Sequence, residues 1–163
     1  MEFSLLNAEE KSAAARELFL SGCNCAQAVA AAFAPEMNLS KEDVLTIMLG
    51  FGGGFGGLRT ICGTISGMTM VISRMLGVPQ PDAENKKAVY AVVRKAAEAF
   101  QSRYETLECK ALLISAGIAV KTEPSERTPE YYRTRPCTRY VETAAAILCD
   151  VLNEAMLGVP SKG

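Results

Sequence analysis

Six cysteines are the side chains of this 163-residue sequence best suited to chemistry, because the chain contains no histidine and no tryptophan. The lack of histidine excludes Ser-His-Asp and Cys-His catalysis and metal sites that need imidazole ligands. No basic and apolar leader begins the sequence, so we expect a cytoplasmic protein, in which structural disulfides are rare. Redox catalysis, metal or cluster binding, and simple burial are the remaining uses for the thiols.

Cys62 follows the most unusual stretch of the chain, GFGGGFGGLRTICGTISG at residues 50–67, which contains eight glycines. A dense glycine run marks backbone that bends sharply or approaches another group closely. The N–H groups at a helix start, together with the charge of Arg59, would favour a thiolate at Cys62. We therefore predict that Cys62 is the most reactive thiol; the alternative is a small buried residue in a tightly packed helix.

The glycine run is also a candidate binding loop, because consecutive backbone N–H groups can form a nest for an anion or a cofactor. Gly63 and Gly67 lie four residues apart and so share a helix face, which predicts close contact with another helix. The candidate binding residues are Gly53, Gly54, Gly56, Gly57, Arg59 and Gly63.

Three further cysteines lie where helices are expected to begin. Cys25 lies in SGCNCAQAV shortly after a glycine, and Cys109 follows an acidic residue. Cys137 directly follows a proline and has Arg135 and Arg139 on either side of it in the sequence. Each is placed where the N-terminus of a helix would lower the pKa of a thiol. Together with the cysteine of the glycine run, four cysteines would thus begin four helices.

The last two cysteines carry weaker signals. Cys23 forms a C-x-C pair with Cys25 and is either a resolving thiol or an accompanying residue, since one such pair is weak support for metal binding. Cys149 lies in the apolar segment AAAILCDVL, which is typical of the buried body of a helix. We expect Cys149 to lie apart from the other thiols.

Helical periodicity runs through nearly the whole chain and predicts an all-α bundle of about six or seven helices in a single domain, residues 1–163. The glycine-rich loop precedes the central helix of this bundle. Residues 121–136 are polar and contain three prolines, so we expect an exposed loop there. The expected helices cover residues 7–22, 24–35, 40–51, 60–76, 82–104, 108–118 and 136–157.

Composition excludes several classes of partner. The chain has 17 basic and 18 acidic residues and a net charge of −1, so nucleic acid is not an expected partner. No apolar run approaches the roughly 20 residues of a membrane helix, so we expect no membrane insertion. An unidentified redox partner is implied by the thiols, and a homo-oligomer is compatible with the sequence.

The order of these motifs resembles a known family. Cys25 lies within NCAQAV, the glycine run leads into CGTISG, and two single cysteines follow. From about Gly22 to Leu152 the chain resembles the redox-active proteins named after the pattern C_GCAxxG_C_C, with Thr64 where the family pattern has alanine. The resemblance assigns the four family cysteines and the two motif glycines to Cys25, Cys62, Cys109, Cys137, Gly63 and Gly67.

Two kinds of chemistry could use these four cysteines. In a thiol–disulfide oxidoreductase, Cys62 would attack the substrate disulfide and Cys25 would resolve the resulting mixed disulfide. Cys109 and Cys137 would form a second thiol pair or an electron relay. In the alternative, the same four residues hold a metal ion or an iron–sulfur cluster without turnover. Separations of 27 to 46 residues are unlike the close pairs of structural zinc sites. A third hypothesis is a helical interaction domain with buried cysteines.

Overall fold

A computed structural model describes residues 2–160, which form nine α-helices, one short 3₁₀ turn at Leu49–Phe51 and no strands. The predicted all-α class is confirmed, and the number of helices is higher than the six or seven expected. The helices are α1 (Ala8–Leu20), α2 (Cys25–Ala31), α3 (Ala34–Met37), α4 (Lys41–Met48), α5 (Gly63–Leu76), α6 (Ala83–Tyr104), α7 (Cys109–Ser115), α8 (Pro129–Thr134) and α9 (Cys137–Leu157).

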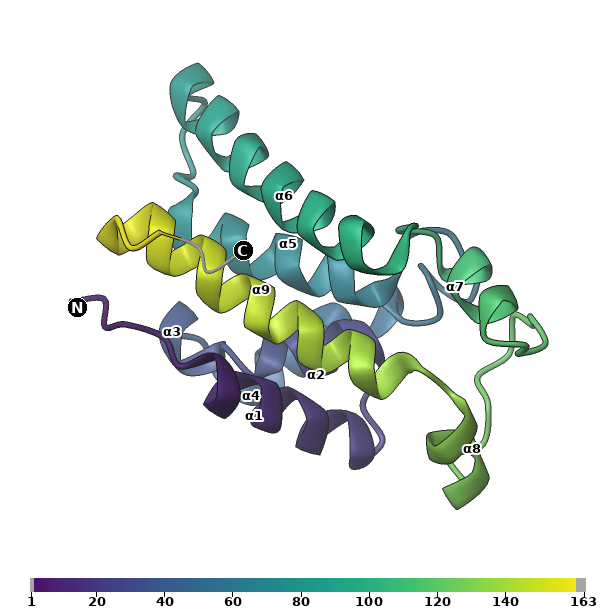
Figure 1. The fold of residues 1–163 in the computed structure, drawn as a ribbon. Coiled ribbons are helices and arrows are strands. Elements are labelled where there is room, and N and C mark those ends of the chain that lie inside the picture. The colour runs from purple at the N-terminus through teal and green to yellow at the C-terminus, as the bar shows by residue number, and fades with distance from the viewer. Residues whose placement is uncertain (1, 161–163) are drawn as a thin grey trace.

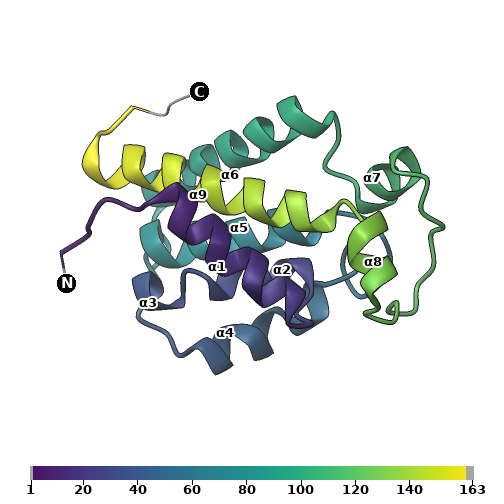
Figure 2. The same cartoon turned by 60° about the horizontal axis from the view of Figure 1, so that its bottom comes forward.

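The long helix α9 runs through the middle of the bundle, with α1 on one side and α6 on the other (Figure 1). The shorter helices α7 and α8 lie at the same end of the bundle, which is the end where α9 begins (Figures 1 and 2). One hydrophobic cluster fills the interior, and its largest fully buried side chains include Phe19, Phe33 and Phe100. The end formed by α7 and α8 therefore brings together segments that are distant in sequence.

Several helices begin at the polar side chains that the sequence indicates. Asn7 accepts a hydrogen bond from the backbone N–H of Glu10, and Ser40 and Asp82 cap α4 and α6 in the same way. At the start of α2, an asparagine and a glutamine form a reciprocal capping box. These caps fix where each helix starts, and the capping box places Cys25 in the first helical position of α2.

The two glycines of the CGTISG motif pack closely against α2, as predicted. A β-carbon placed on Gly63 would lie 3.0 Å from the backbone nitrogen of Ala26. A β-carbon placed on Gly67 would lie 3.0 Å from both the Ala26 carbonyl oxygen and Val29 Cβ. Because these distances are shorter than ordinary contacts, only glycine lets α5 and α2 approach so closely.

The expectation of an exposed loop over residues 121–136 is wrong in part, because α8 lies within it. Thr128 caps this helix by accepting the N–H of Tyr131, and a proline occupies the first helical position. Tyr132 packs edge-on against Phe19, with ring centroids 5.8 Å apart. The Arg127 guanidinium lies 4.7 Å from the Phe19 ring centroid, so the segment is held to the core by aromatic contacts.

Two other boundaries also differ from the expectation. The helix expected over residues 24–35 divides into α2 and α3 at Ala32 and Phe33, and Pro35 lies in the first turn of α3. Pro136 is the N-cap of α9, so the first helical residue is Cys137. In the described part of the chain, no helix is long and apolar enough to cross a membrane.

Replacing Gly67 with leucine tests the packing of α5 on α2. We expect Gly67→Leu to lower the free energy of unfolding by about 1–3 kcal/mol, because the new side chain would overpack the contact with Ala26 and Val29. Gly50→Leu is the matched control, since a β-carbon there has no atom within 4 Å. Thermal and urea denaturation of both variants make the measurement. Equal stabilities of the two variants would contradict the packing claim.

Candidate functional site

A narrow cavity of about 60 Å³ lies at the end of the bundle near α7 and α8, and the four cysteines assigned by the family pattern all line it. They are Cys25, Cys62, Cys109 and Cys137. The four thiols therefore converge on one cavity, although their helices are distant in sequence. All six cysteines of the chain are free thiols in the structure.

Each of the four cysteines lies at a helix start, as the sequence indicates. Cys25, Cys109 and Cys137 are the first residues of α2, α7 and α9, and Cys62 is the N-cap of α5. Cys62 and Cys137 are buried, whereas Cys25 and Cys109 are half-buried. The cavity is thus the meeting point of four helix N-termini, an arrangement that favours negative charge.

A short antiparallel bridge between Ile61 and Glu108 joins the two backbone segments that lead into Cys62 and Cys109. The N–H of Cys62 donates to the Leu107 carbonyl at 2.8 Å, and the N–H of Cys109 donates to the carbonyl of residue 60 at 2.6 Å. These two hydrogen bonds connect the end of the glycine loop to the start of α7, although 46 residues lie between the two cysteines.

Glycine makes two of the contacts around the cavity possible. A β-carbon on Gly54 would lie 2.6 Å from Cys109 Cβ, and one on Gly63 would lie 3.2 Å from Cys25 Cβ. Gly54 also has a positive φ of 66°, a conformation that residues with a β-carbon rarely adopt. The glycine-rich sequence therefore serves close approach to the cysteines.

Four of the six candidate binding residues line the thiol cavity. The cavity is lined by Gly53, Gly54, Arg59 and Gly63, but not by Gly56 and Gly57. The N–H groups of Gly56 and Gly57 donate to backbone carbonyls within the same loop. These two glycines therefore hold the loop in shape, and the structure places them outside the thiol cavity.

Three arginines line the same cavity: Arg59, Arg127 and Arg135. Nη1 of Arg59 donates to the sulfur of Cys109 at 3.7 Å. The positive charge of Arg135 stabilises the Cys137 thiolate. The neighbouring arginine at position 139 is exposed and does not line the cavity. Each arginine with a thiol partner thus favours the charged form of that thiol.

Cys25 and Cys137 both line the cavity and influence each other's ionisation, and their pKa values shift in opposite directions. The hydrogen bond from Cys25 and the positive charge of Arg135 lower the pKa of Cys137 to about 7, against the effect of burial. The same hydrogen bond, together with burial, raises the pKa of Cys25 well above its ordinary value. Cys137 also begins a helix of 21 residues, whose dipole favours a thiolate there. Cys137 is therefore the thiolate of the pair.

The electrostatics of the cavity contradict the prediction that Cys62 is the most activated thiol. Burial raises the pKa of Cys62 to about 12, although hydrogen bonds from the Thr64 hydroxyl and backbone N–H act in the opposite direction. Arg59, which is close to Cys62 in sequence, turns its side chain to Cys109 instead. Burial also raises the pKa of Cys109, and Arg59 limits that rise.

The two remaining cysteines lie outside the cavity. Cys149 is buried in the body of α9, and burial raises its pKa to about 12. Its expected separation from the other thiols is confirmed. Cys23 does not line the cavity either, but its carbonyl accepts a hydrogen bond from Arg127 at 3.2 Å. The position of Cys23 thus helps to hold an arginine of the site.

The four thiols line one cavity without forming a recognisable metal centre. Among residues 2–160, no group of three or more cysteine, aspartate or glutamate side chains lies close enough to hold a metal ion. A tetrahedral zinc site needs four ligands at about 2.0–2.3 Å from one point, and a cluster needs a comparable set of thiolates. The arrangement therefore gives the metal or iron–sulfur hypothesis no geometric support.

The cavity residues that sequence analysis does not identify include Arg127, Tyr131 and Tyr140. Burial raises the pKa of both tyrosines to about 12, so their hydroxyls stay protonated near neutral pH. Arg127 stacks on Tyr131, with its guanidinium carbon 4.6 Å from the ring centroid. The signal that could have revealed this segment is Thr128 followed by Pro129, a helix start next to two aromatic residues.

Comparison with known proteins agrees with the motif assignment. The model of a family described as "Putative redox-active protein (C_GCAxxG_C_C)" matches residues 23–151 of the chain. The chain belongs to this family. Neither a curated protein nor a solved structure matches it. The matched region of the C_GCAxxG_C_C family includes all four cysteines of the cavity, and it ends before the last turns of α9.

The electrostatics of the cavity predict the pH dependence of labelling by a small neutral alkylating agent. Cys137 should label first among the six thiols. Its rate should rise with pH, reach half its maximum near pH 7, and level off above, because the lowered pKa keeps the reactive thiolate present at neutral pH. Mass spectrometry of partly labelled, reduced protein gives the rate at each cysteine.

Two charge-matched variants identify the cause of this reactivity. Arg135→Gln should move the midpoint of Cys137 labelling to higher pH, and a rise of one pH unit would slow labelling at pH 7 roughly fivefold. Arg139→Gln removes the same charge from an exposed neighbour and should leave the midpoint in place. Labelling of Cys62 or Cys149 ahead of Cys137 would contradict the assignment.

Proposed function

We propose that this chain is a thiol–disulfide redox protein in which Cys137 is the attacking thiolate and Cys25 is its resolving partner. The single observation that carries this proposal is that these two thiols line one cavity and shift each other's pKa in opposite directions, and only the Cys137 thiolate is stabilised by Arg135. One thiolate beside one protonated thiol is the starting state that thiol–disulfide exchange requires. Membership of a family described as redox-active supports the same chemistry.

The proposed reaction exchanges one disulfide for another. The Cys137 thiolate attacks a sulfur of the substrate disulfide, forms a mixed disulfide and releases the first half of the substrate as a thiolate. Cys25 then attacks the Cys137 sulfur, its proton passes to the departing sulfur, and the second half leaves as a thiol. Two cysteine thiols are oxidised to the Cys25–Cys137 disulfide, and one substrate disulfide is reduced to two thiols.

Arginine and the neighbouring thiol control the proton and the charge in these steps. Arg135 stabilises the Cys137 thiolate before the attack. The raised pKa of Cys25 keeps its proton in place until the mixed disulfide forms, when the Cys137 sulfur loses its charge. Because the two thiols line the same small cavity, little movement is needed between the first step and the second.

Cys62 and Cys109 are proposed as a second dithiol of the same cavity. Their raised pKa values keep both protonated, which suits a later step better than the first attack. As a pair they would reduce the Cys25–Cys137 disulfide by exchange and become oxidised themselves. An external dithiol or thiol reductant would then restore them. The metal-binding alternative has no comparable observation in its favour among the described residues.

Trapping the mixed disulfide tests the order of attack. With bis(2-hydroxyethyl) disulfide as the oxidant, Cys25→Ser should accumulate a mixed disulfide on Cys137, because the attack still occurs and its resolution does not. Cys137→Ser should lose most of its reaction with the same oxidant, whereas Cys149→Ser should behave as the unaltered protein. Intact-mass and peptide mass spectrometry identify the modified residue.

The outcomes of this trapping experiment separate the alternatives. A mixed disulfide that accumulates on Cys62 would restore Cys62 as the nucleophile and overturn the proposed order. If anaerobically purified protein holds stoichiometric metal, and its thiols react only after chelation, the metal-binding alternative is correct and the redox proposal fails.

A further inference from the structure

A second, larger cavity adjoins the thiol cavity. This outer groove has a volume of about 430 Å³, within the range of small-molecule sites. The thiol cavity, at about 60 Å³, has room only for the reacting end of a ligand. Six residues line both cavities and therefore form the boundary between them: Asn24, Gly53, Arg59, Arg127, Tyr131 and Arg135.

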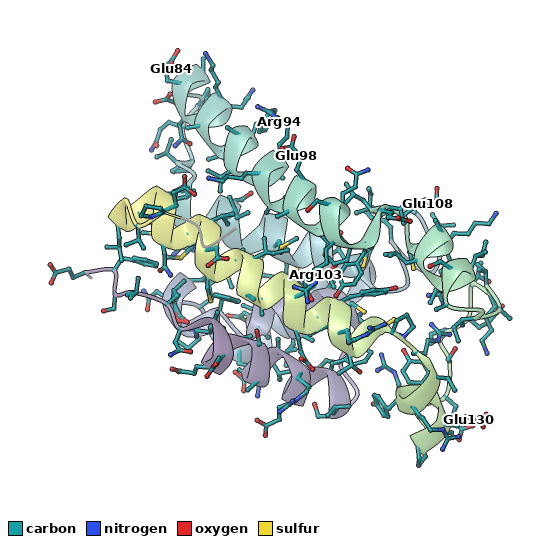
Figure 3. The ribbon with its side chains drawn as sticks, in the orientation of Figure 1. Glu84, Arg94, Glu98, Arg103, Glu108 and Glu130 are labelled. Carbon is teal, nitrogen blue, oxygen red and sulfur yellow. The ribbon has the colours of Figure 1, made fainter. Side chains whose placement is uncertain are left out.

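Three of these boundary residues are arginines, and no acidic side chain of the described chain lines either cavity. The ion pairs that the structure shows within residues 2–160 lie on other parts of the molecule. Figure 3 shows Glu130 on α8 and Glu108 at the start of α7; both are exposed and neither lines a cavity. The boundary therefore concentrates positive charge that no carboxylate lining the two cavities offsets.

The three guanidinium groups are held in place by neutral groups. Arg59 Nε donates to the Lys121 carbonyl at 2.9 Å, Arg127 donates to two backbone carbonyls, and Arg135 Nη2 donates to Ser125 Oγ at 2.8 Å. A guanidinium has five N–H donors, so these contacts and those to the thiols leave several donors on each arginine for a ligand. Arg59 is buried, and Arg127 and Arg135 are half-buried, which strengthens their attraction for an anion.

We infer that the thiol site takes a small anionic disulfide, whose carboxylates or other oxyanion groups bind the three arginines while its sulfur–sulfur bond reaches Cys137 from the outer groove. This assignment rests on the proposed exchange chemistry and names its substrate class. A planar guanidinium matches the geometry of a carboxylate and binds it with two parallel hydrogen bonds. The narrow inner cavity then admits the disulfide sulfur and little else.

Three small disulfides of similar length and different charge test the substrate class. We compare 3,3′-dithiodipropionate, which has two negative charges, with the neutral bis(2-hydroxyethyl) disulfide and the doubly positive cystamine. Reduced protein should react with the dianion at least about tenfold faster than with the neutral compound, and slowest with cystamine. The preference should shrink as salt is added, because salt screens charges. Equal rates, or a preference for cystamine, would overturn the inference.

Arginine variants test which residues cause the preference for the anionic disulfide. Arg127→Gln should reduce the ratio of the dianion rate to the neutral rate several-fold, and Arg127→Lys should retain part of it. The ratio cancels any change in the reactivity of Cys137 itself. Arg94→Gln, an exposed position on α6 (Figure 3), removes the same charge and should leave the ratio unchanged. If Arg127→Gln fails to fold, Arg59→Gln provides the same test. A ratio that neither variant alters would overturn the inference.

A redox-inert ligand separates this inference from the proposed function. Suberate has the length and charge of 3,3′-dithiodipropionate, with two methylenes in place of the sulfurs. Calorimetry should detect suberate binding to the reduced protein, weakened by Arg127→Gln and unaffected by Arg94→Gln. Suberate binding without any disulfide exchange would support the anion site and overturn the proposed function. Exchange that shows no charge preference, without suberate binding, would overturn the anion site alone.

Discussion

The site depends on how closely backbone can approach backbone at two glycines. Gly63 lets the start of α5 contact the start of α2 beside Cys25, and Gly54 lets the glycine loop lie directly against Cys109. A side chain at either position would separate helix starts that must meet for the cavity to exist. The cost of ordering so much glycine is offset by contacts between segments that no local sequence connects.

In the proposed exchange, charge placement decides which of the four thiols attacks. All four lie at helix starts, so the backbone alone does not distinguish them. Burial opposes ionisation at Cys62, whereas Arg135 and the proton of Cys25 favour it at Cys137. Two thiols that influence each other's ionisation titrate as a pair, and the arginine determines which member holds the charge.

The fold class and the position of four cysteines at helix starts can be predicted from the sequence, because helical periodicity and helix-start residues are local patterns. The meeting of these cysteines in one cavity depends on tertiary packing. The thiol that is proposed to attack cannot be predicted in this way. Arg59 turns towards Cys109 and Arg135 acts on Cys137, and these two contacts depend on tertiary packing. Helix α8 escapes prediction because three prolines suggest a loop, although one of them occupies the helical position that proline favours. The internal hydrogen bonds of the loop glycines at 56 and 57 are equally invisible in the sequence.

The pairing of Cys25 with Cys137 also has a consequence for the unfolded chain. The two residues are separated by 111 others, so a disulfide between them would close a loop that includes most of the molecule. In the chain-entropy model, closing a loop of roughly 100 residues removes enough freedom from the unfolded state to stabilise the fold by about 4.7 kcal/mol. Oxidation would thus make the chain harder to unfold and to degrade, and reduction would reverse this. The redox state of this proposed pair would then change the free energy of unfolding of the whole chain.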